Sequence, residues 1–304
     1  MRVGAFELID PLPQLRDPHL FTILQPWIDV GSVGTLALGT LEKELGAEEL
    51  GKLERPSNFY DFTRYRPMLS RRDGERIVEP PNTVIRYAKG EGESDFLFMH
   101  LLEPHANGED FVDSLIELAD TLGVARYCQI GAMYGSTPHT RPLVASGQST
   151  DPDVQGMLAS QGVRTSNYEG PTSIMALATQ ELTKRNIATM SVLVQLPPYA
   201  RLEEDHRGQE RLLRLLSPIY RFSLGELDSI ERHGDRQYQE IDRMAQMDSR
   251  IQSLVKQLEE SYDSEQSEVK TDAGASSEPE PPQLSADLER FLRDLESGDE
   301  GTSA

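Results

Sequence analysis

The stretch LFTILQPWIDVGSVGTLALGTLEKELG, residues 20–46, decides the fold of this chain. It begins with an apolar run, passes through Pro26 and the glycine-spaced loop 31–34, and continues with apolar residues at helical spacing up to Gly46. This order predicts a strand, a glycine turn and a helix that stops at Gly46. Together they form the opening half of a βαβ unit, so we expect an α/β fold.

The composition excludes several functional classes. A formal net charge of -21, from 51 acidic and 30 basic residues, repels phosphate backbones and anionic lipid, which argues against nucleic-acid and membrane partners. No stretch approaches the roughly 18 apolar residues of a membrane span. The single cysteine, Cys128, excludes an intramolecular disulfide and favours the reducing cytoplasm. No His/Cys cluster has zinc spacing, and nothing predicts a cofactor.

The rest of the body repeats the opening pattern. A nearly all-apolar strand at 95–102, an amphipathic helix at 109–122 and a strand at 125–130 predict a parallel crossover, and 189–196 is a further buried strand. We therefore expect a mostly parallel sheet. The segment 48–81 reads as an excursion whose aromatic side chains pack on the body or on a neighbouring subunit.

A long helix is expected after the body. Ser223 and Glu226 have the spacing of a capping box, and the helical pattern that follows reaches about Tyr262, roughly 58 Å at about 1.5 Å per residue. Its apolar seam, interrupted at Asp248, fits either a coiled-coil contact or a helix folded back on the body. The expected division is a body at 1–222, a long helix at 223–262 and a tail at 263–304.

The tail is acidic and low in apolar residues, so we expect disorder from Asp263 to Gln283. A short amphipathic helix is expected at 284–296. It needs a groove on this protein or on another, because it cannot bury its apolar face alone. The predicted partner-binding face consists of Leu284, Leu288, Phe291, Leu292 and Leu295.

Two loops are candidate ligand sites. Gly31 and Gly34 at a strand-to-helix turn can present amides to a phosphate, although the loop is neither GxGxxG nor a Walker loop. The simpler interpretation is that these glycines let the helix pack closely on the sheet, with Trp27 and Asp29 fixing the turn.

The second loop, 131–142, leaves the C-terminal end of a strand, where open α/β sheets bind ligands. His139 and Arg141 in this loop can make an anion pocket, and histidine titrates near neutrality. Flanking prolines and the lack of a carboxylate or second histidine at an informative spacing favour a rigid structural loop. The nucleophile elbow GxSxG is also missing, so no catalytic residue is predicted.

Four segments in this order resemble the proteasome assembly chaperone family, in the branch similar to the second chaperone subunit and its archaeal and bacterial relatives. They are WIDVGSVG (27–34), PHTRP (138–142), YEGPTSIMALATQELTKRNI (168–187) and VLVQLPPYA (192–200). The resemblance covers roughly residues 18–220, and the long helix and tail helix look like those of bacterial members.

The resemblance implies a three-layer α/β/α domain similar to the nucleoside-phosphorylase fold, used for protein association in a homo-oligomer, with a trimer favoured. Some archaeal relatives reach the proteasome through a C-terminal hydrophobic-Tyr-any motif. This chain ends in Gly301-Thr-Ser-Ala304, so that docking mode is in doubt.

Two functional hypotheses remain open. The first is a non-enzymatic assembly or scaffolding protein whose partner is a protein, with the proteasome as one candidate. The second is a phosphorylase-like or ligase-like enzyme that binds a small phosphate-containing ligand through Gly31, Gly34, His139 and Arg141.

Overall fold

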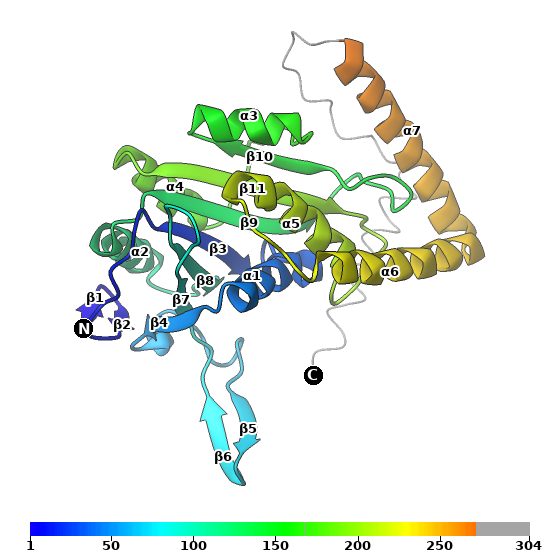
Figure 1. Cartoon of the computed structure of the whole chain (residues 1–304). Helices are drawn as coiled ribbons and strands as arrows, with labels where there is room; N and C mark the ends of the chain where they lie inside the picture. Colours follow the sequence, from blue (N-terminus) through cyan, green and yellow to red (C-terminus); the bar gives the residue numbers. More distant parts are fainter. Residues whose placement is uncertain (167, 272–304) are drawn as a thin grey trace.

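The computed structural model describes residues 1–166 and 168–271, and their main feature is a nine-stranded sheet covered by helices (Figure 1). The strands of the sheet are β1 (Arg2–Val3), β2 (Phe6–Leu8), β3 (His19–Gln25), β4 (Glu48–Leu53), β7 (Val84–Ala88), β8 (Phe96–Leu102), β9 (Arg126–Tyr134), β10 (Ala145–Ser149) and β11 (Ala188–Leu196). The helices are α1 (Val33–Glu44), α2 (Gly108–Leu122), α3 (Pro152–Ser160), α4 (Met175–Lys184), α5 (His206–Tyr220), α6 (Leu227–Met247) and α7 (Ser249–Thr271).

The sheet is mixed, which corrects the expectation of a mostly parallel one. Its strand order is β1-β2-β4-β7-β8-β3-β9-β11-β10. The central strands β8, β3, β9 and β11 pair in parallel, as the βαβ pattern predicts, but the strands on both sides of them pair antiparallel. Antiparallel neighbours need no crossover helix. A short turn between Ala88 and Phe96 is therefore enough to join β7 to β8.

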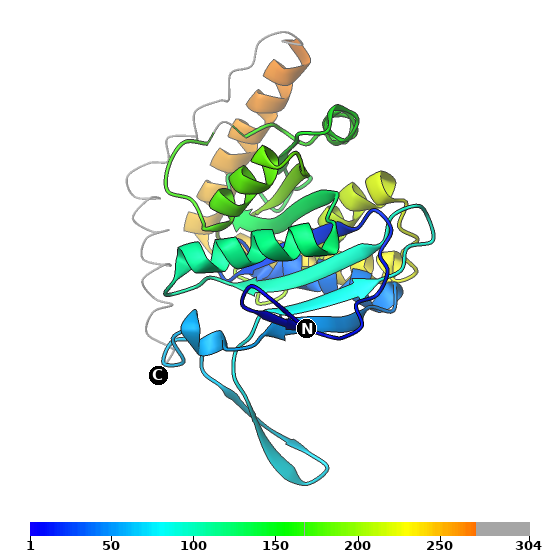
Figure 2. The same cartoon turned by 90° about the vertical axis from the view of Figure 1, so that its left-hand side faces the viewer.

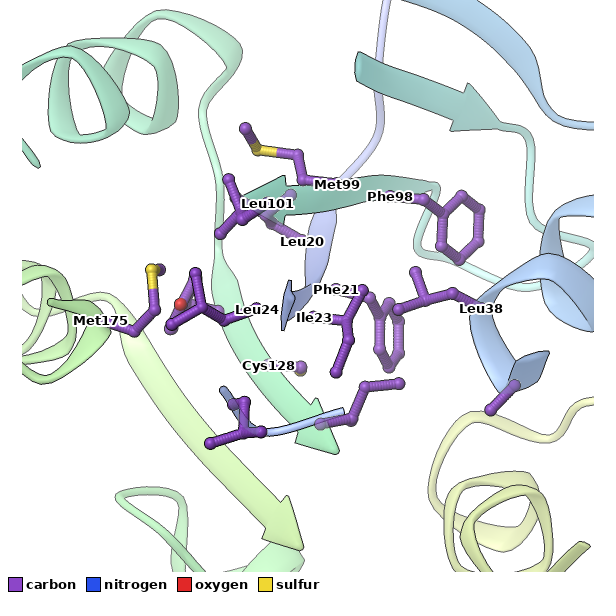
Figure 3. Packing of buried hydrophobic residues seen from close by; sticks show 14 of the residues in the cluster. Leu20, Phe21, Ile23, Leu24, Leu38, Phe98, Met99, Leu101, Cys128 and Met175 are labelled. Carbon is purple, nitrogen blue, oxygen red and sulfur yellow. The ribbon is translucent and has the colours of Figure 1, made fainter. Parts of the chain in front are cut away.

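Helices lie on both faces of the sheet, so the body has three layers. Helices α1 and α5 pack on one face, while α2 and α4 lie on the other (Figures 1 and 2). Alternate residues of the central strands point to opposite layers: Phe21 of β3 lies toward Leu38 of α1, and Leu24 lies toward Met175 of α4 (Figure 3). Burial on both faces explains why β3 carries apolar residues at adjacent positions and is buried from His19 to Leu24.

The excursion at 48–81 contributes more to the fold than expected. Its first part is β4, which joins the main sheet, and the short 3-10 helix η2 (Pro56–Asn58) follows. Phe59 and Tyr60 are buried, which confirms that these aromatics pack on the body. The remainder forms a separate hairpin of β5 (Met68–Arg72) and β6 (Glu75–Glu79) that extends away from the body (Figures 1 and 2).

The expected single long helix is wrong, because the chain forms two helices that meet at Asp248. This residue has extended backbone angles (φ -117°, ψ 113°), and its carboxylate accepts a hydrogen bond from the Arg250 amide at 2.8 Å. Asp is a preferred residue at a helix start, so the interruption in the apolar seam begins a new helix. The capping box is also not formed, since Glu226 makes no side-chain cap.

The structure favours packing on the body over a coiled coil for α6. It lies against α5, and its residues Tyr238 and Ile241 join the main hydrophobic cluster. Helix α7 continues to Thr271, so 263–271 is helical where disorder was expected. The predicted tail helix, with Leu284, Leu288, Phe291, Leu292 and Leu295, lies outside the described residues. The division of the chain at residues 222 and 262 stays a prediction.

Candidate functional site

The loops that follow β3, β9 and β11 meet at the C-terminal ends of the parallel strands. The amide of Asp205, in the loop after β11, donates to the carbonyl of Gly31 at 2.8 Å. The hydroxyl of Tyr238, on α6, donates to the Asp205 carboxylate at 3.0 Å. The structure thus gathers the predicted loops at one end of the sheet, as open α/β sheets do, and places α6 beside them.

Both glycines of the turn allow close packing, and Gly34 confirms the expected close approach of the helix to the sheet, whereas Gly31 lies against the loop after β11. Gly31 has a φ of 60°, and a Cβ there would lie 2.9 Å from the Cβ of Asp205. A Cβ on Gly34 would lie 2.2 Å from Cδ1 of Ile23 on β3. A side chain at position 34 would therefore force Ile23 or the helix itself to move.

The amides at the start of α1 are already occupied by the chain itself. The Asp29 carboxylate accepts from the amides of Gly34 at 2.8 Å and Thr35 at 3.1 Å, and from the Thr35 hydroxyl at 2.5 Å. Burial raises the pKa of Asp29, while these hydrogen bonds oppose that shift. A carboxylate thus sits where a phosphate would bind. Asp29 fixes the turn as predicted, but Trp27 is 57% exposed and does not.

His139 is buried and held between two partners. Its backbone amide and ring Nδ1 lie 2.9 Å and 2.7 Å from the Tyr199 hydroxyl, and its Nε2 lies 3.4 Å from Oδ1 of Asp242 on α6. Since the hydroxyl accepts the amide proton, its own proton points to Nδ1, which favours the tautomer protonated at Nε2. Burial lowers the pKa of His139, and Asp242 partly opposes this shift.

Arg141 connects the same loop to α7. Its guanidinium pairs with Asp263 through Nε at 2.9 Å and Nη2 at 2.7 Å, and with Glu259 at 3.1 Å. The hydrogen bonds to Asp263 raise the pKa of Arg141. Thr140 also donates to Glu259, at 2.5 Å. Carboxylates of its own chain therefore occupy Arg141, the predicted anion-binding residue. The loop that contains it is a packing surface for α7.

A shallow depression of about 490 Å³ lies between this loop and α6. Of the four predicted ligand residues, only His139 lines it, so the four do not converge on one pocket. Another cation of its lining, Arg207, is paired within the chain: it contacts Asp235 at 2.7 Å and lies 4.5 Å from the Tyr238 ring centroid. The depression is lined by His139, Thr140, Arg207, Asp235, Tyr238, Gln239, Asp242 and Arg243.

Sequence reasoning missed the partners of His139 and Arg141. Asp242 lies 103 positions after His139, and Asp263 lies 122 positions after Arg141, so no local spacing connects them. Within residues 1–166 and 168–271 no group of three or more His, Cys, Asp or Glu side chains is arranged to hold a metal. The same part of the chain contains no helix with the length and apolar character that crossing a bilayer requires.

Solved structures similar to this chain come from bacteria and archaea. A PAC2 family protein from Streptomyces avermitilis is 27% identical, with a TM-score of 0.68 over 79% of this chain and 100% of that one. The proteasome-assembly chaperone homologue of Mycobacterium tuberculosis is 22% identical (TM-score 0.67, 78% and 99% covered). The archaeal proteasome activator PbaB of Pyrococcus furiosus is 16% identical (TM-score 0.62, 81% and 100% covered).

A search of the curated proteins finds no match. The model of the PAC2 family, however, matches residues 23–245, which is more than half of the chain. This span runs from β3 to near the end of α6 and contains both predicted ligand loops. The chain therefore belongs to the PAC2 family.

Proposed function

We propose that this chain is a non-enzymatic, protein-binding member of its family that works as a homo-oligomer, in the manner of an assembly chaperone. One observation carries the proposal: the residues best suited to small-molecule chemistry contact the chain itself. Asp29 occupies the amides at the start of α1, and Arg141 holds α7. Because these residues are engaged within the chain, we infer that the protein acts by binding other polypeptides through its outer surfaces.

The partner we propose is related to the proteasome. Family membership supports this, as does the similarity in fold to a proteasome-assembly chaperone homologue and to a proteasome activator. We further propose a trimeric assembly, a body similar to the nucleoside-phosphorylase fold, and a cytoplasmic location. The location rests on the single cysteine, which is free and buried.

We propose that the apolar face of the tail pattern at 284–296 captures the partner. An amphipathic helix with leucines at three- and four-residue spacing fits an apolar groove. The acidic residues around this face favour a partner with a basic rim. This role is separate from the contacts of α7, which involve Arg141 and Arg164 of the body.

The test is co-elution of the full-length chain with unassembled proteasome subunits of its own organism. The wild type and the polar-face control Glu289→Ser/Arg293→Ser should capture the subunits. The double variant Leu288→Ser/Phe291→Ser should lose this capture. Equal capture by both double variants would remove the role of the tail. No capture by the wild type would contradict a proteasome-related partner.

A further inference from the structure

Two histidines that lie outside the predicted ligand loops face each other on neighbouring helices. His206 begins α5, His233 lies on α6, and the two helices pack side by side (Figure 1). The centroids of the two rings are 5.6 Å apart. Both histidines line a depression of about 470 Å³ between α1, α5 and α6. His233 is exposed and His206 half-buried, so an ion can reach both rings from solvent.

The packing of α6 on the start of α5 fixes the two rings relative to each other. Gly234 follows His233, and a Cβ on this glycine would lie 2.7 Å from the amide nitrogen of Arg207. The absence of a side chain there lets α6 approach α5 closely. The amide of His206 also donates to the side-chain oxygen of Gln237 on α6 at 3.1 Å. The histidines are therefore held in place by helices and not by loops alone.

The ring of His206 is oriented by a buried glutamine. The Gln209 side-chain nitrogen donates to the carbonyl of Leu36 at 3.3 Å and to the hydroxyl of Thr40 at 3.0 Å. This orientation turns the Gln209 side-chain oxygen toward Nδ1 of His206, at 2.8 Å. An amide oxygen can only accept, so Nδ1 carries the proton. In the neutral ring, Nε2 then has a free lone pair.

The ring of His233 is oriented in the same way by its own helix. Its Nδ1 lies 2.9 Å from the backbone carbonyl of Ser229, one turn earlier. A carbonyl oxygen also only accepts, so Nδ1 of His233 is the donor. The two neutral imidazoles thus share one tautomer, with a lone pair on each Nε2.

This arrangement matches the way in which proteins hold a metal with histidine. A ring nitrogen binds Zn²⁺ at about 2.0–2.1 Å, which places the ion roughly 3.2 Å from the ring centroid, so two rings on one ion have centroids up to about 6.4 Å apart. The observed 5.6 Å lies within this limit. Histidines that bind a metal usually donate their second ring N–H to an oxygen acceptor, as both rings do here.

The charges around the pair also suit a cation. The carboxylate of Glu204 lies 3.9 Å from Nε2 of His206, close enough to offset part of the charge of an ion. Lys43 lines the same depression but pairs with Glu226. The protein supplies two nitrogen ligands and water supplies the rest, which agrees with the lack of a group of three metal-binding side chains in the part of the chain that the structure describes.

We propose that His206 and His233 bind one divalent transition-metal ion through their Nε2 atoms. Imidazole ligands favour Zn²⁺, Cu²⁺ and Ni²⁺ over Mg²⁺ and Ca²⁺, which prefer oxygen. The bound ion would join α5 to α6 at the edge of the body. The inference goes beyond the proposed protein-binding function and does not depend on it.

The test is isothermal titration calorimetry of Zn²⁺ into the untagged full-length protein, with excess Ca²⁺ present to fill carboxylate sites. The wild type should bind one ion in a saturable way. His206→Gln and His233→Gln should each weaken this binding by about tenfold or more, because each removes one of two nitrogen ligands. His105→Gln removes an exposed histidine of the loop after β8 and is the control, which should bind as the wild type does.

Three results would overturn the site. They are no saturable Zn²⁺ binding in the wild type, binding by both α5 and α6 variants equal to that of the wild type, and an equal loss in the control. Because His233 is exposed, His233→Gln should keep the circular dichroism spectrum of the wild type, so its loss of binding reports on the ligand and not on the fold.

Discussion

At the residue scale, the glycine turn at the end of β3 brings two layers of the body into contact. Gly34 lies against Ile23 of the sheet, and the carboxylate of Asp29 completes the first turn of α1. The sequence predicted this role for the glycines and for Asp29 because strand, turn and helix are neighbours along the chain. The exposure of Trp27 was not predictable, since it depends on which distant segments cover the turn.

A matched pair of glycines on α1 tests this packing. Gly34→Ala should lower the free energy of unfolding by about 1–3 kcal/mol, the usual effect of overpacking. Gly39 lies on the same helix with nothing within 4 Å of an added Cβ, so Gly39→Ala should raise stability by up to about 1 kcal/mol. Urea denaturation measures both. Equal effects of the two substitutions would show that position 34 is not tightly packed.

At the scale of the elements, α6 and α7 explain what the loop after β9 does. His139 and Arg141 lie in that loop, and their partners Asp242 and Asp263 come from these two helices. The sequence predicted a helix in this region and showed that Asp248 interrupts its apolar seam. The break itself was not predicted, because the apolar seam continues on both sides of Asp248. The ion pairs join residues over a hundred positions apart, which only the folded chain brings together.

The contact between Arg141 and α7 can be removed without unfolding the body. Arg141→Ala deletes the pairs to Glu259 and Asp263, both partly exposed, so global stability should change little. Amide hydrogen exchange in α7 should become severalfold faster, because the helix loses contacts that hold it to the body. Lys256→Ala, at an exposed position of α7, is the control. Unchanged exchange in Arg141→Ala would show that other contacts hold α7.

At the scale of the whole molecule, a three-layer body carries two projections, the β5–β6 hairpin and α7, on opposite sides (Figure 1). The alternation of strands and helices predicted the parallel centre of the sheet and its covering helices. The antiparallel flanks were missed because β4 has only two leucines among charged residues, although both leucines are buried. The predicted ligand residues lie at the same end of the sheet. The two glycines there allow close packing, and His139 and Arg141 contact other residues of the chain. This arrangement favours binding of other polypeptides over small-molecule chemistry.

Scanning calorimetry at increasing ligand concentrations tests most directly whether the chain binds polypeptides and not small molecules. Phosphate, nucleosides and nucleotides are titrated into the full-length protein, and the unfolding temperature is recorded at each concentration. A ligand present at 100 times its Kd would add about 2.7 kcal/mol and raise the Tm by about 4–5 °C. We predict no saturable rise. A saturable rise in the wild type that disappears in His139→Gln and Arg141→Ala would contradict a purely protein-binding role.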